Sequence, residues 1–121
     1  TIDYQVESIL KKDSLDITDA DRQHILEKVQ GETSEHIVIT HGTDTMVETA
    51  QALNEVTGKT IVLVGAMQPA RFKDSDAIFN TGFAVAAATL LSPGLYIAMN
   101  GRVVKWDRYQ RNEETGQFAE K

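Results

Sequence analysis

The chain has no cysteine, and this absence removes several kinds of chemistry at once. Disulfide bonds, thiol nucleophiles and thiolate metal sites are all excluded. The three histidines, His24, His36 and His41, are scattered along the chain without the spacing of a metal site. We therefore expect neither a metal nor any other cofactor.

An excess of basic residues and a long apolar run are also missing. The formal net charge is −6, whereas nucleic-acid-binding proteins normally present a basic face. No apolar stretch approaches the roughly 20 residues that are needed to cross a bilayer, and the first residues do not resemble a signal peptide. We expect no nucleic-acid partner, no membrane partner and a cytoplasmic location.

What the sequence does contain is a regular alternation of β-branched runs and amphipathic segments. Its 121 residues are enough for one domain with a buried core. Strands are predicted at residues 4–10, 36–40, 60–65, 95–99 and 102–106, and a helix is predicted after each of the first three. This order is typical of a three-layer α/β domain of the Rossmann or flavodoxin kind, with a mostly parallel sheet between helices. Residues 107–121 are polar and weakly patterned, so they are predicted to form a tail.

Several local signals refine this prediction. Thr18 and Asp21 have the spacing of a capping box at a helix start. The run at residues 60–65 is apolar throughout, which predicts a central strand buried on both faces. Asn100 and Gly101 form a strong turn signal, so the last two strands are predicted to form a C-terminal β-hairpin.

The helix expected after residue 74 has an apolar stripe at helical spacing, made of Phe79, Phe83, Ala86 or Ala87, and Leu90. These residues are predicted to face the core. A glycine inside a helix is unfavourable by about 1 kcal/mol relative to alanine. Gly82 therefore suggests a place where this helix packs closely against a strand.

A stretch at residues 37–50 joins a β-branched run to an amphipathic segment through a single glycine, Gly42. This pattern predicts a buried strand, a sharp turn and a helix that begins at the turn. Five of the six residues at positions 40–45 carry polar side chains, which packing alone does not require. Ligands of α/β sheets bind outside the carboxyl ends of the strands, so this corner is the predicted active site.

Polar groups from other strand ends are expected to meet at the same edge of the sheet. Ser14, residues 40–44 and residues 66–68 each follow a predicted strand. Backbone N–H groups at helix starts favour anions such as carboxylates, and an aspartate beside them can hold an amine. These groups suit a small zwitterion such as an amino acid. A threonine can act as a nucleophile when it is activated, so the site predicts amide or ester hydrolysis with Thr43 and Asp44 as the working pair.

Each of these residues also has a simpler interpretation. Thr43 and Asp44 could be an ordinary pair of helix-capping residues. Ser14 could belong to a polar turn, and Ala66 could merely permit close packing. His41 is interpreted as an orienting or core histidine rather than as a base.

The segment Thr40-His41-Gly42-Thr43-Asp44-Thr45 resembles the second signature of the bacterial-type L-asparaginases, which convert asparagine to aspartate and ammonia. Residues 64–69 are similar to the Val-Gly-Ala-Met-Arg-Pro segment of that family, and residues 13–16 to its Ser-Gln-Asp substrate loop. The six-residue motif reverses the capping interpretation of Thr43 and Asp44.

The resemblance implies a role for each matching position. Thr43 would be the second catalytic threonine, and Asp44 would hold the α-amino group of the substrate. Ser14 would bind the α-carboxylate, and the backbone of Ala66 would meet the substrate amide. The family also implies a homo-oligomer.

Three departures from the family pattern are visible. Leu15 stands where the family has glutamine, and Arg111 falls near its catalytic lysine. The first family motif, Thr-Gly-Gly-Thr-Ile, carries the acyl nucleophile and does not occur in residues 1–121. We therefore expect that a strand–helix unit of ~30 or more residues precedes this single domain.

The resemblance makes an asparaginase-type amidohydrolase the leading hypothesis. The alternative is a catalytically inactive module of the same fold that binds an amino acid and regulates another protein. A phosphate- or dinucleotide-binding protein is disfavoured because the sequence has no Gly-x-Gly-x-x-Gly pattern.

Overall fold

The computed structural model describes residues 4–10, 12–66, 74–99, 101–111 and 118–120. Four strands form one sheet in the order β1 (His36–Gly42), β2 (Thr60–Ala66), β3 (Gly94–Met99) and β4 (Arg102–Lys105). The first three strands are parallel, and β4 pairs with β3 in the antiparallel direction. The predicted C-terminal hairpin is therefore confirmed.

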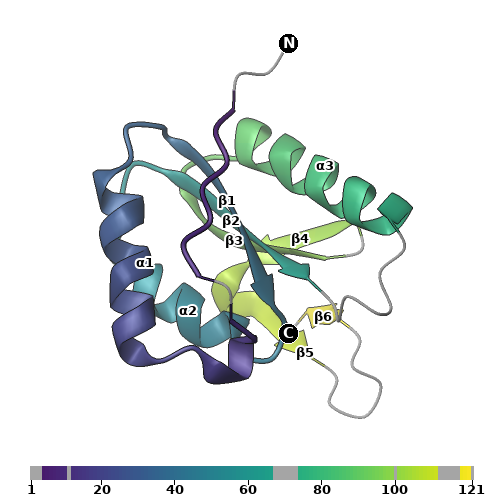
Figure 1. Cartoon of the computed structure of the whole chain (residues 1–121). Helices are drawn as coiled ribbons and strands as arrows, with labels where there is room; N and C mark the ends of the chain where they lie inside the picture. Colours follow the sequence, from purple (N-terminus) through teal and green to yellow (C-terminus); the bar gives the residue numbers. More distant parts are fainter. Residues whose placement is uncertain (1–3, 11, 67–73, 100, 112–117, 121) are drawn as a thin grey trace.

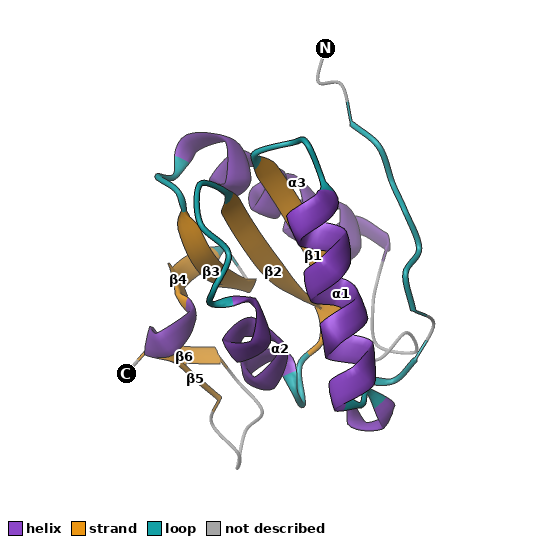
Figure 2. Ribbon diagram, turned by 90° about the vertical axis from the view of Figure 1, so that its left-hand side faces the viewer, coloured by secondary structure: helices purple, strands orange, loops and turns teal. Residues whose placement is uncertain are grey.

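Helices cover both faces of this sheet (Figure 1). The helices α1 (Asp19–Gly31) and α2 (Met46–Leu53) lie on one face, and α3 (Asp74–Leu90) lies on the other, as the side view in Figure 2 shows. This is the predicted three-layer α/β architecture. No helix within the described residues is long and apolar enough to cross a membrane.

Strand β2 contributes to both halves of the core because its side chains alternate between the two faces. Ile61 and Leu63 pack in the cluster that contains α1 and α2 residues, whereas Val62 and Val64 pack with alanines of α3. All four side chains are at most 3% exposed. The prediction of a central strand buried on both faces is confirmed.

Strand β1 differs from the prediction, because it lies at the edge of the sheet. Ile37, Val38 and Ile39 are only partly buried, and β1 pairs on one side, with β2. An edge strand has one fewer neighbour to cover it, so its apolar side chains keep part of their exposure.

The strand predicted at residues 4–10 is wrong, because this segment has no regular secondary structure. It runs past the β1 side of the sheet (Figure 2) without joining the sheet, and Tyr4 and Val6 are 79% and 86% exposed. A strand requires a hydrogen-bonded neighbour, and no described strand pairs with this segment. An ion pair of 2.7 Å between Glu7 and Lys28 holds the segment to α1.

Helix α1 begins as the sequence predicts. The Thr18 hydroxyl accepts a hydrogen bond from the backbone N–H of Asp21, and the Asp21 carboxylate accepts one from the N–H of Thr18. Ile25, Leu26 and Val29 are buried on one face of the helix. The capping box and the apolar stripe of α1 are both confirmed.

Helix α3 agrees with the prediction only in part. Phe79 and Leu90 are 59% and 81% exposed, whereas Ala84, Ala87 and Ala88 face the sheet. Small side chains let the helix approach the strands, and Phe83 is partly buried against the same cluster, as predicted. Gly82 is exposed and has no atom within 4 Å of a position where a Cβ would lie, so it marks no close packing.

The segment predicted as a tail contains short regular elements. The 3-10 helix η3 (Trp106–Arg108) leads into β5 (Tyr109–Arg111), which pairs with β6 (Phe118–Glu120). Tyr109 is 5% exposed and belongs to the main core cluster. The buried Tyr109 therefore anchors the start of a segment whose sequence is mostly polar.

Candidate active site

The polar turn between β1 and α2 lies at the carboxyl edge of the sheet, where the sequence predicts the site. Strand β1 ends at Gly42, and α2 begins at Met46 with Thr45 as its N-cap residue. Thr43 and Asp44 thus lie before the N-cap position. The interpretation of these two residues as an ordinary capping pair does not fit this geometry.

The loop that carries Ser14 lies directly against this turn. Ser14 begins the 3-10 helix η1 (Ser14–Asp16). A Cβ placed on Gly42 would lie only 2.8 Å from both the Cβ and the Oγ of Ser14. The Thr45 hydroxyl donates a hydrogen bond of 2.6 Å to the backbone carbonyl of Ser14. The structure therefore brings Ser14 together with the Thr43–Asp44 turn, and Gly42 makes room for the contact.

The hydroxyl of Ser14 has an unusual environment. Ser14 is 2% exposed, and its Oγ makes no hydrogen bond with any described residue. Leaving a buried polar group without a partner is unfavourable by about 1–3 kcal/mol. Such an atom beside a polar turn is available to a ligand.

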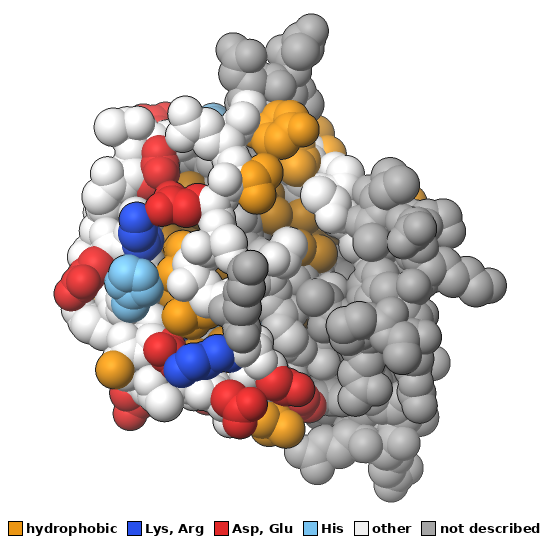
Figure 3. Space-filling model, in the orientation of Figure 1, with side chains coloured by type: hydrophobic (Ala, Val, Ile, Leu, Met, Phe, Trp, Pro, Cys, Tyr) orange, Lys and Arg blue, Asp and Glu red, His pale blue; other side chains and the backbone are white. Residues whose placement is uncertain are grey.

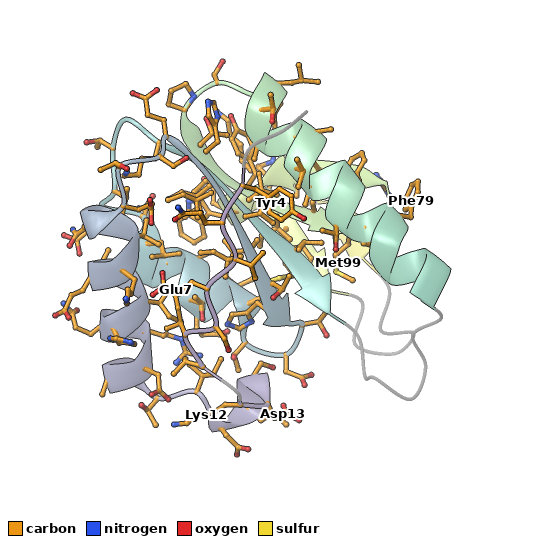
Figure 4. The ribbon with its side chains drawn as sticks, turned by 45° about the horizontal axis from the view of Figure 1, so that its top comes forward. Tyr4, Glu7, Lys12, Asp13, Phe79 and Met99 are labelled. Atoms are coloured by element: carbon orange, nitrogen blue, oxygen red, sulfur yellow. The ribbon has the colours of Figure 1, made fainter. Side chains whose placement is uncertain are left out.

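The methyl group of Thr43 packs against Gly65 of β2. A Cβ on Gly65 would lie 3.0 Å from the Thr43 Cγ2 and 2.8 Å from the Met99 Sδ, so Gly65 allows both side chains to approach the sheet. Figure 4 labels Met99 close to the tip of β2. The Tyr109 hydroxyl lies 4.0 Å from the Met99 sulfur as a hydrogen-bond donor.

Asp44 and Ala66 complete the predicted set. Asp44 is exposed, as a residue that meets a ligand from solvent would be. Ala66 ends β2 and is paired in register with Gly42, so its backbone lies beside the turn. Residues 67 and 68, which the sequence also assigns to this edge, lie outside the described residues.

A hydrogen-bonded chain behind the turn was not predicted from the sequence. Arg22 Nε–H donates to Thr49 Oγ1 at 3.1 Å, and Thr49 Oγ1 lies 2.7 Å from His41 Nε2. His41 Nδ1 lies 2.6 Å from the carbonyl oxygen of Gly42. The available signal was Thr49 itself, a hydroxyl on the apolar face of α2.

The directions of these hydrogen bonds fix the tautomer of His41. A carbonyl oxygen only accepts, so His41 Nδ1 carries the proton and donates it to Gly42. His41 Nε2 then accepts from the Thr49 hydroxyl, which in turn accepts from Arg22. Burial lowers the pKa of His41 below 6.5, the bond to Gly42 opposes this shift, and the charge of Arg22 adds to it. His41 is therefore a neutral orienting residue, as the sequence interpretation has it.

Two of the departures from the family pattern can be placed. Leu15 is 70% exposed, an unusual position for a large apolar side chain. Arg111 lies in β5, in the small two-stranded sheet. No group of three His, Asp or Glu residues that could hold a metal is present within the described part of the chain.

The chain also matches a known protein family. The family described as "Asparaginase, N-terminal" matches residues 1–118. The chain belongs to the asparaginase family.

Individual relatives agree with the family match. The chain is 38% identical over 102 residues to a glutaminase-asparaginase from Acinetobacter glutaminasificans, a match that covers 80% of the chain and 30% of the relative. A probable periplasmic L-asparaginase from Haemophilus influenzae is 38% identical over 105 residues, covering 81% of the chain and 30% of the relative. A glutamyl-tRNA(Gln) amidotransferase polypeptide from Methanococcus vannielii is 46% identical over 72 residues, covering 58% of the chain and 17% of the relative.

A crystal structure of a probable cytoplasmic L-asparaginase from Campylobacter jejuni has the same fold. It matches with a TM-score of 0.75 and 33% sequence identity over 87% of this chain and 35% of the other. The matches cover between 17% and 35% of these relatives. The chain thus spans about a third or less of the proteins that it resembles.

Proposed function

We propose that this chain contributes to an asparaginase-type amidohydrolase that hydrolyses the side-chain amide of L-asparagine, or of a related small amide, to the acid and ammonia. The observation that carries the proposal is the buried Ser14 hydroxyl, which has no hydrogen-bond partner among the described residues. It lies against Gly42 beside Thr43 and Asp44 in a member of this family. A site that lacks its substrate would leave such a hydroxyl without a partner.

Each group has a proposed task. The Ser14 hydroxyl donates to the α-carboxylate of the substrate, and the exposed Asp44 carboxylate accepts from the α-ammonium group. The backbone of Ala66 contacts the side-chain amide from its place beside Gly42. Thr43 serves as the second threonine of the catalytic cluster.

The reaction is proposed to run in two steps. A threonine oxygen attacks the amide carbon, and the C–N bond breaks as ammonia leaves, which forms an acyl-enzyme. Water then attacks the ester and releases the acid. The attacking threonine is expected on a segment that precedes residue 1, as the family resemblance implies.

The free edge of β1 supports this last expectation. Ile37, Val38 and Ile39 are partly exposed there. Figure 3 shows hydrophobic side chains among polar ones on the face of the molecule seen in Figure 1. An apolar strand edge of this kind readily accepts another strand. We propose that a preceding strand–helix unit adds to this edge and brings the acyl nucleophile to Thr43.

The test is ammonia release from L-asparagine and L-glutamine by the full-length gene product. Thr43→Val, which keeps the shape and removes the hydroxyl, is expected to lower the rate by a factor of about 100 or more. Thr89→Val is the matched control, because Thr89 is an exposed threonine of α3 whose hydroxyl bonds its own helix at Val85. Equal rates for the two variants would refute the role of Thr43.

A non-catalytic amino-acid-binding module is the second candidate. It is favoured by Leu15, which stands at the glutamine position of the family's substrate loop. Calorimetric titration with L-aspartate separates the two hypotheses. Binding that Asp44→Ala abolishes, without ammonia release by the full-length protein, would support the module, and neither binding nor release would reject both.

Assembly and location are proposed on the family resemblance. We expect a homo-oligomer, which light scattering coupled to gel filtration would detect as a mass above that of one chain. A relative named periplasmic and one named cytoplasmic both exist. We propose the cytoplasm for this protein, and cell fractionation tests it.

A further inference from the structure

Two loops of the candidate site are connected to the same partly buried side chain, Arg22. Its side chain is 11% exposed. Its Nε–H donates a hydrogen bond to the Thr49 hydroxyl. From Thr49 the hydrogen bonds continue through His41 to the Gly42 carbonyl. Its NH1 group donates at 3.3 Å to the carbonyl of Ile17, which directly follows the η1 helix that carries Ser14. One guanidinium group therefore donates hydrogen bonds to Thr49, which is linked to the turn through His41, and to the loop that carries Ser14.

We propose that Arg22, Thr49 and His41 form a positioning relay that sets the Thr43–Asp44 turn relative to the Ser14 loop. This proposal rests on the proposed function, since its purpose is to hold the carboxylate-binding and catalytic groups in register. The three residues touch no substrate group directly. They act through the carbonyls of Gly42 and Ile17.

The relay works in one protonation state only. A neutral His41 accepts from the Thr49 hydroxyl and donates to the Gly42 carbonyl, so every donor has an acceptor. If His41 gained a second proton, on Nε2, this nitrogen would become a donor and could no longer accept from the Thr49 hydroxyl. The Thr49 hydroxyl would then need another acceptor for its own proton. The charged groups near His41 are Arg22 from α1, which disfavours this proton, and Glu48 from α2, which favours it. Asp19 lies 3.8 Å from Arg22 and moderates its charge.

The chain offers a matched pair of variants at the middle of the relay. Thr49→Val keeps the shape of the 0%-exposed side chain and removes its hydroxyl, whereas Thr49→Ser keeps the hydroxyl. Thr89→Val again serves as the remote control. If Thr49→Val fails to fold, Arg22→Lys answers the same question, because an ammonium lacks the planar fork that reaches two acceptors.

The first measurement needs no ligand. Nitrogen-15 NMR is expected to show His41 with its proton on Nδ1. The backbone amides of Ser14, Gly42, Thr43 and Asp44 are expected to shift with pH at the same midpoint as His41. Thr49→Val should uncouple the amide shifts of Ser14 from those of the turn, and Thr49→Ser should keep the coupling. The proposal would be overturned by a neutral His41 with its proton on Nε2. It would also be overturned if the chemical shifts of the turn amides did not follow the titration of His41.

The second measurement uses amide hydrolysis by the full-length protein. Thr49→Val is expected to lower kcat about 10-fold or more, because a displacement of about 1 Å is enough for such losses. The pH dependence of its activity should also differ from that of the wild type. Thr49→Ser should restore both kcat and the wild-type pH profile. A Thr49→Val enzyme as active as Thr89→Val would overturn the proposal.

The two measurements distinguish a failure of the proposed function from a failure of the relay. If the wild-type protein hydrolyses no amide, the proposed function fails and the NMR result alone decides whether the relay exists. If the wild type is active and the NMR coupling is absent, the proposed function stands and the relay fails.

Discussion

The methyl group of Thr43 lies against Gly65 so closely that a Cβ on Gly65 would come within 3.0 Å of it. This contact fixes which way the threonine faces, because a methyl group packed on the sheet leaves the hydroxyl to point elsewhere. Gly65 also accommodates the sulfur of Met99, and Met99 in turn contacts Tyr109. The position of Thr43 thus depends on a glycine in β2 and on the end of β3.

Gly65→Ala is expected to destabilise the protein by about 1–3 kcal/mol, because an added methyl group overpacks a tight contact. Met99 is flexible and can move away from the 2.8 Å contact, but Thr43 lies on a turn with less freedom. Urea denaturation measures the loss. In a Met99→Ala background, Gly65→Ala should still destabilise the protein, because the contact with Thr43 remains. No further loss relative to Met99→Ala alone would show that Thr43 is not confined by Gly65.

The opposite result is expected at the glycine of α3. Gly82 is exposed, and nothing lies within 4 Å of the position that an added Cβ would occupy. Gly82→Ala should therefore raise the free energy of unfolding by up to about 1 kcal/mol through helix propensity. The same urea experiment checks it. A loss of stability would mean that this face of α3 packs against something outside the described residues.

The buried histidine predicts how stability depends on pH. Burial depresses the pKa of folded His41 below 6.5, whereas the unfolded chain has the ordinary value of about 6.5. The unfolded state then binds the extra proton more readily, so stability is complete above pH ~6.5 and falls as the pH drops toward the folded pKa. The slope cannot exceed about 1.4 kcal/mol per pH unit for one group.

Chemical denaturation at a series of pH values from well above the ordinary histidine pKa to well below it would measure this dependence. His41→Gln, which keeps an amide near the Nε2 position and cannot titrate, should flatten the curve in this range. A variant that retains the wild-type slope would assign the effect to a different group.

Periodicity and turn residues were sufficient for most of the fold. The apolar run of β2, the capping box at Thr18 and the hairpin around Gly101 are local signals, and the structure agrees with each. A strand at residues 4–10 could not be assessed locally, because alternation in a sequence says nothing about whether a neighbouring strand is present. The exposure of Phe79 and Leu90 on α3 was equally inaccessible, since the small alanines of this helix fit closer to the sheet.

Less of the candidate site than of the fold could be predicted from the sequence. Polar residues in the turn after β1 led to the hypothesis for Thr43 and Asp44. Ser14 does lie beside this turn, although the strand that was predicted to precede it does not form. The relay through Thr49 was not predictable, because it joins residues of α1, α2 and β1 that are adjacent only after folding. The sequence also carries no sign that the Ser14 hydroxyl is left without a partner among the described residues. That is a property of packing against Gly42.

The unpartnered hydroxyl leads to a prediction that separates stability from ligand binding. Ser14→Ala removes a buried Oγ that bonds no described residue, so stability should stay within about 0.5 kcal/mol of the wild type or increase. Binding of L-aspartate should weaken about 10- to 100-fold, because a hydrogen bond to a charged carboxylate contributes about 1.5–3 kcal/mol.

Ser34→Ala is the matched control for this experiment. Ser34 is an exposed serine whose hydroxyl bonds the backbone of His36 at 3.0 and 3.2 Å. Its loss should lower stability slightly and leave aspartate binding unchanged, the reverse of the result at Ser14. Calorimetry for binding and urea denaturation for stability measure both variants. If Ser14→Ala instead lost more than about 1 kcal/mol of stability and bound aspartate normally, the hydroxyl would be a structural group and Ser14 would not belong to the binding site.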